Sequence, residues 1–159
     1  MSVTITKDRM ADVLKSIQSL VKERTLVGIP AANAERRDGP INNAAIGYIN
    51  EFGSPANNIP ARPFLIPGVE AAQPKVVKQL RRGADQALGG KLDAADKALH
   101  SAGIVAVNAV RAKISEGIPT PLKASTIAAR ARRGRTGTKP LIDTGQLRNS
   151  LTYVVRKVK

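Results

Sequence analysis

The densest charge in the chain lies near its C-terminus. Between positions 130 and 139, five of ten residues are basic and none is acidic: Arg130, Arg132, Arg133, Arg135 and Lys139. Such a cluster is typical of a site that contacts nucleic-acid phosphates or an acidic protein surface, although a solvated loop has the same composition. The whole chain contains 26 Lys and Arg against 12 Asp and Glu, a net charge of +14. We therefore expect these five residues, in a basic loop over 130–140, to contact an anionic partner.

Other patterns give little support for catalysis. Asp93, Asp96 and His100 share one side of a predicted helix and could hold a divalent cation, but they also supply the polar face that such a helix needs. The chain has no Cys and one His, so thiolate metal sites are excluded and Ser-His-Asp chemistry is not expected. No phosphate-binding loop motif occurs. The sequence predicts no enzyme, no cofactor and no metal.

Composition also bears on nucleic acid and membranes. The basic stretches contain no aromatic residue on which bases could stack, so only non-specific contact with duplex DNA is expected. No apolar run approaches the ~18 residues of a membrane span, and the N-terminus lacks the pattern of a signal peptide. We expect no membrane partner.

Apolar spacing predicts a single α+β domain over 1–159, with several helices packed on a small, mainly antiparallel sheet. An apolar stripe predicts the first helix, through Met10, Val13, Leu14, Ile17, Leu20 and Val21. Two short β-rich runs, Thr25–Ile29 and Leu151–Val158, are expected to be strands of one sheet. The remaining predicted helices run from Asn43 to Gly53, over 68–88, from after Gly90 to Gly117, over 121–133 and over 145–149.

Residues 54–68 are predicted to form an extended arm, because four prolines favour extended backbone there. The arm also carries apolar side chains, which must pack on their own domain or on a neighbouring subunit. We predict a subunit interface at Ile59, Arg62, Phe64, Leu65 and Ile66.

Two blocks of sequence carry a family resemblance. The first is Glu51-Phe52-Gly53 at the end of a helix, followed by Ile59-Pro60-Ala61-Arg62-Pro63-Phe64-Leu65. The second is Pro121-Leu122-Lys123-Ala124-Ser125-Thr126-Ile127, then Lys139-Pro140-Leu141-Ile142-Asp143-Thr144-Gly145-Gln146-Leu147, continuing through Ser150-Leu151 to Tyr153. Together they resemble the neck and tail-completion proteins of tailed bacteriophages, a group labelled virion morphogenesis or minor tail component. Asn50 departs from the pattern, in which a His often precedes Glu-Phe-Gly.

The resemblance implies a small structural protein that forms a homo-oligomeric ring at the head–tail junction of the virion, as a connector, collar or tail-completion component. Its partners would be further copies of itself, neighbouring neck, portal-side or tail proteins, and packaged duplex DNA. It would be made in the bacterial host cytoplasm. A small basic, non-sequence-specific DNA-binding protein remains the alternative; it explains the charge but not the apolar arm.

Overall fold

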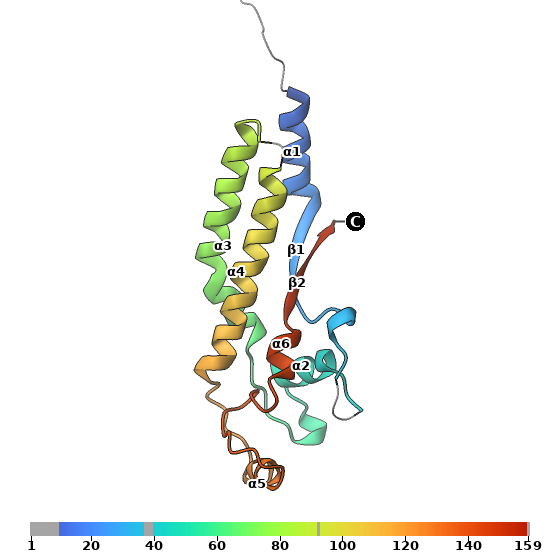
Figure 1. The fold of residues 1–159 in the computed structure, drawn as a ribbon, viewed down its shortest axis with the longest axis vertical. Coiled ribbons are helices and arrows are strands. Elements are labelled where there is room, and N and C mark those ends of the chain that lie inside the picture. Colours follow the sequence, from blue (N-terminus) through green and yellow to red (C-terminus); the bar gives the residue numbers. More distant parts are fainter. Residues whose placement is uncertain (1–9, 37–39, 92, 159) are drawn as a thin grey trace, which may run out of the picture.

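The computed structural model describes residues 10–36, 40–91 and 93–158, and it confirms the α+β class. Within that part of the chain, six α-helices pack with a two-stranded antiparallel sheet (Figure 1). The helices are α1 (Met10–Lys22), α2 (Asn43–Phe52), α3 (Leu65–Leu88), α4 (Ala94–Glu116), α5 (Ala124–Arg132) and α6 (Gln146–Ser150). The strands are β1 (Glu23–Gly28) and β2 (Thr152–Lys157).

The long hairpin of α3 and α4 is the frame of the molecule (Figure 1). Five of the ten buried positions of α4 are alanine and a sixth is Gly103, so a neighbouring backbone can approach closely. Gly83 on α3 uses this closeness, because a Cβ there would overlap the Ala98 side chain. Pro74 lies inside α3 without ending it, and the carbonyl that loses its partner belongs to exposed Glu70.

The predicted pairing of the two β-rich runs is confirmed. β1 and β2 are antiparallel, with Glu23 opposite Lys157 and Gly28 opposite Thr152. The ribbon lies along α4 (Figure 1), where the Thr25 hydroxyl donates to the Leu99 carbonyl at 2.9 Å. The edge of the Tyr153 ring packs against His100. The two ends of the described chain therefore meet on one helix.

The main apolar cluster joins the hairpin to the lower end of the molecule. Its buried members are Phe64, Val110, Ile114, Ile118 and Leu151. They come from the start of α3, from α4 and the segment after it, and from the residue before β2. In Figure 1, the short helices α2 and α6 lie beside the lower end of the hairpin, and α5 lies below it.

The prediction of an extended arm over 54–68 is wrong at both ends of that segment. A 3-10 turn, η2 (Pro55–Asn57), and a bridge between Ser54 and Ile59 fold its start back on itself. Its last residues are helical, because α3 begins at Leu65 rather than at 68. Gly53 allows the reversal: its φ is +79°, and a Cβ there would lie 2.9 Å from the Ala61 amide nitrogen.

Most of the apolar stripe on the first helix is exposed to solvent, whereas such a stripe ordinarily faces the core. Helix α1 forms as predicted, but Met10, Leu14, Ile17 and Val21 on it are all exposed. Helix α1 contacts α3 and α4, and Val13 of the predicted stripe is half-buried. An apolar stripe with spacing of four, three and four residues thus remains uncovered in the single chain.

We predict that Gly83→Ala destabilises the protein despite the higher helix propensity of alanine. The added methyl group must displace α3 from α4, and overpacking of this kind costs about 1–3 kcal/mol. The measurement is the free energy of unfolding in urea. Gly89→Ala is the control, since its Cβ would make only an ordinary contact at 3.4 Å. Equal stability of the two variants would contradict the close packing at Gly83.

Candidate interaction site at the lower end

Glu51 organises the lower end of the molecule. Its buried carboxylate accepts three backbone hydrogen bonds, from the amides of Phe64 and Leu65 at 2.8 Å and of Ile66 at 2.9 Å. These amides begin α3, so the last turn of α2 caps the first turn of α3. Helix N-termini favour negative charge and leave amides without partners inside the helix, and one carboxylate serves both needs. Sequence reasoning assigned Glu51 only to the end of a helix and missed this contact.

The predicted interface residues separate into buried and accessible groups. Arg62 is 7% exposed, and its guanidinium donates to the carbonyls of Thr120 at 3.3 Å and Pro121 at 2.7 Å. Phe64 is 1% exposed in the subunit's own core. The prediction that Arg62 and Phe64 contact a neighbouring subunit is therefore corrected, because both side chains are buried within their own subunit. Ile59 and Leu65 are half-buried, and Ile66 is exposed.

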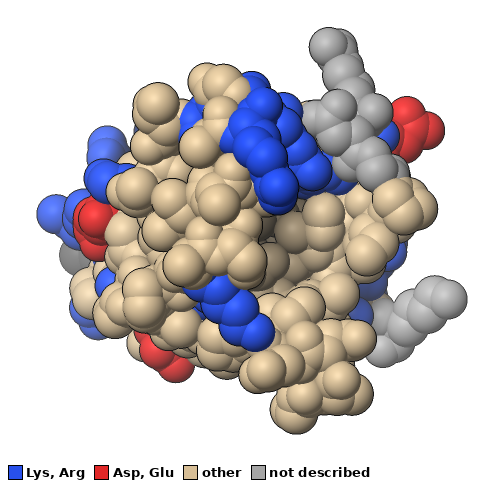
Figure 2. Space-filling view, turned by 90° about the horizontal axis from the view of Figure 1, so that it is seen from below, with Lys and Arg blue, Asp and Glu red and all other residues tan. Residues whose placement is uncertain are grey.

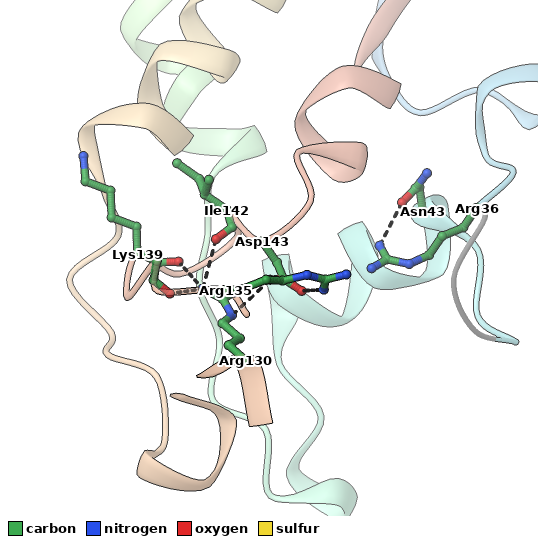
Figure 3. A network of polar contacts seen from close by, with 8 residues as sticks. Arg36, Asn43, Arg130, Arg135, Lys139, Ile142 and Asp143 are labelled. Carbon is green, nitrogen blue, oxygen red and sulfur yellow. Dashed lines mark hydrogen bonds and ion pairs between the residues drawn. The ribbon is translucent and has the colours of Figure 1, made fainter. Parts of the chain in front are cut away.

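The predicted basic loop over 130–140 is also corrected. Its first three residues belong to the end of α5, and Arg130 is only 8% exposed. The Arg130 guanidinium donates to the carbonyls of Gly137, Lys139 and Ile142 at 2.9–3.0 Å, as Figure 3 shows. Its Nε lies 3.7 Å from Asp143. Arg130 thus fixes the fold of the following loop and is not available to an external phosphate.

The other four basic residues of the cluster differ in accessibility. Arg135 pairs with Asp143 at 2.7 Å and is half-buried. Lys139 is exposed, although its ammonium donates to the Ser115 carbonyl at 2.9 Å. Arg132 and Arg133 are exposed, with no side-chain hydrogen bond or ion pair to the part of the chain that the structure describes. Of the predicted contact residues, these two are the most accessible.

A groove of about 450 Å³ opens between α2 and α5. Its apolar lining comes from α2, from the segment around Ile59 and from residues flanking α5 and α6: Ile41, Ile46, Ile49, Ile59, Leu122, Leu141 and Leu147. Arg36, Lys123 and Arg133 line it as well, together with the buried Arg62 and Arg130. Figure 2 views the molecule from this end, with Lys and Arg gathered on two sides of a hollow.

A pair of aromatic rings lies on the outer side of α2. Tyr48 is 67% exposed and Phe52 is 57% exposed, and their ring centroids are 4.9 Å apart. The chain has only four aromatic residues of the Phe, Tyr and Trp types. The exposure of both rings shows that neither belongs to the subunit's own core. Exposed aromatic rings of this kind are enriched in protein–protein interfaces.

The residues of the possible cation site, Asp93, Asp96 and His100, contact other side chains at and near the start of α4. The Lys97 ammonium pairs with Asp93, and this hydrogen bond lowers the pKa of the Asp93 carboxyl. Asp96 lies 3.6 Å from His100. No group of three potential metal ligands occurs among the residues that the structure describes.

Comparison with protein-family models, curated proteins and solved structures gives no match for this chain. None of the described helices combines the length and the apolar character needed to cross a membrane.

We predict that Glu51→Gln lowers the free energy of unfolding by about 2 kcal/mol, because three charge-assisted hydrogen bonds lose the acceptor charge. Urea unfolding measures the loss. The control is Glu70→Gln on exposed α3 surface, which is expected to change stability by no more than ~0.5 kcal/mol. If both variants unfold alike, the carboxylate does not hold the start of α3.

We predict that Arg130→Ala destabilises the fold by about 3 kcal/mol, since it leaves three carbonyls and Asp143 without their buried partner. Arg132→Ala, two residues away and exposed, is expected to stay within ~0.5 kcal/mol of the original protein. Thermal unfolding of the two variants compares them directly. If the Arg130→Ala protein is as stable as the original protein, the hydrogen bonds of Arg130 do not stabilise the fold.

Proposed function

We propose that this chain is a structural, non-catalytic virion protein of a tailed bacteriophage. In this proposal it forms a homo-oligomeric ring in the neck that joins the DNA-filled head to the tail, in a connector, collar or tail-completion role. One observation carries the proposal: the two sequence blocks that resemble the neck proteins form one folded unit. Arg62 of the first block bonds to Pro121, and Phe64 packs in the same cluster as Leu151 of the second.

Uncovered apolar surface supports assembly into a ring. The aromatic patch, Tyr48, Phe52 and Ile66, is exposed beside the start of α3, and the α1 stripe is exposed at the opposite end of the hairpin (Figure 1). A ring needs two different surfaces on each subunit, because its contacts are heterologous. The aromatic patch and the α1 stripe are two such surfaces. They replace Phe64 and Arg62 as the proposed contacts between copies.

The alternative function is non-specific DNA binding by a small basic protein. The charge of +14 and the exposed Arg132 and Arg133 favour it. Light scattering of the purified protein without DNA separates the two functions. A ring favours the neck protein, whereas a monomer or dimer with salt-sensitive affinity for duplex DNA favours the alternative.

Antibody labelling of intact particles then tests the location, and label away from the head–tail junction would contradict the neck role.

We predict that the double variant Tyr48→Ser and Phe52→Ser abolishes the ring while the subunit stays folded. Exposed aromatic anchors at interfaces often contribute about 2 kcal/mol or more each, and here they are not part of the subunit core. Light scattering measures the mass of the assembly, and circular dichroism checks the fold. Ile104→Ser, a half-exposed residue on α4, is the control and should keep the ring. Rings of normal mass from the double variant would exclude this patch as a contact.

A further inference from the structure

The groove between α2 and α5 carries more positive charge than its own residues neutralise. Among the described residues that line it, five are Lys or Arg and one, Asp143, is acidic. Asp143 is already shared between Arg130 and Arg135. Arg62 and Arg130 direct their hydrogen bonds to carbonyls, which satisfy the donors but do not cancel the charge. The groove therefore favours a ligand that brings carboxylates or other anions.

The apolar lining of the groove distinguishes between two anionic ligands, duplex DNA and an acidic peptide. Phosphates of duplex DNA stay hydrated and contact protein through charged and polar groups, so they would leave Ile46, Ile49 and Leu122 uncovered. A ligand with apolar side chains would bury these residues. The volume of about 450 Å³ has room for a few side chains but not for a duplex.

The cations also come from three separate places around the apolar lining. Arg36 precedes α2, Lys123 precedes α5 and Arg133 follows α5. Arg36 is held by a hydrogen bond to Asn43 (Figure 3), and Lys123 by one to the Asn58 carbonyl. All three line the same groove as the apolar side chains. A peptide that carries both carboxylates and a large apolar side chain therefore matches the groove better than a purely anionic ligand does.

We propose that this groove binds an acidic, apolar peptide segment of a neighbouring protein. In the virion, that neighbour would be an adjoining neck or tail protein. Only this choice of partner rests on the function proposed above. Binding itself needs only the folded subunit. The apolar side chain would pack against Ile49 and Leu122, and the carboxylates would lie beside Lys123 and Arg133.

The test is a selection of random displayed peptides on the purified protein, followed by affinity measurements with the enriched peptides. We expect enriched sequences to combine Asp or Glu with large apolar residues. Replacing their apolar residues by serine should weaken binding about tenfold, which separates the groove from general attraction to a basic protein. Both Arg133→Glu and Ile41→Ser should weaken binding to a similar degree, because each residue lines the groove and is exposed enough to be changed without loss of the fold.

Two matched controls lie outside the groove. Arg132→Glu makes the same charge change one residue away, and Ile127→Ser makes the same apolar change on α5. Both should bind the peptides as the original protein does. The proposal is overturned if no acidic, apolar sequences are enriched, if the controls and the groove variants lose affinity equally, or if duplex DNA displaces the peptides completely. Because the groove lies within one subunit, a protein that forms no rings but binds the peptides contradicts the neck ring and leaves the groove intact.

Discussion

The carboxylate of Glu51 is the interaction on which the lower half of the molecule depends. A helix of 24 residues begins at Leu65, and its first amides have no partners within the helix. Glu51 satisfies three amides there and brings α2 against the start of α3. This contact places Phe64 in the core and leaves Phe52 outside it. The buried Glu51 thus adjoins two aromatic residues with different environments. Phe64 stabilises the subunit core, and Phe52 is exposed on the surface.

Arginine has two physical roles in this chain, and they follow from burial. The segments between α4 and β2 contain short helices and irregular backbone, so several carbonyls there lack partners in regular structure. Arg62, Arg111 and Arg130 supply donors to such carbonyls. Part of the large positive charge is therefore required by the fold. Arg132 and Arg133, by contrast, are exposed and have no side-chain hydrogen bond within the part of the chain that the structure describes.

Local patterns in the sequence were sufficient to predict the α+β class, the helix from Asn43 to Gly53 and the positions of the two β-rich runs. Apolar periodicity and glycine positions act over a few residues, so these features can be read from neighbouring positions. The contacts of Arg130 and the capping of α3 could not be predicted in this way. Arg62, for example, reaches carbonyls 58 and 59 residues further along. The groove likewise combines α2 with the flanks of α5, and its lining has no local pattern.

The pairing of Glu23 with Lys157 has a consequence for how the chain reaches its folded state. Contacts between distant residues require a large loop to close, and the entropy of closure opposes them until other contacts shorten the loop. The hairpin of α3 and α4 consists of neighbours in sequence and needs no such closure. During synthesis β2 is made after every other described element, so β1 lacks its partner until then. During that interval the open edge of β1 lies within reach of other nascent chains.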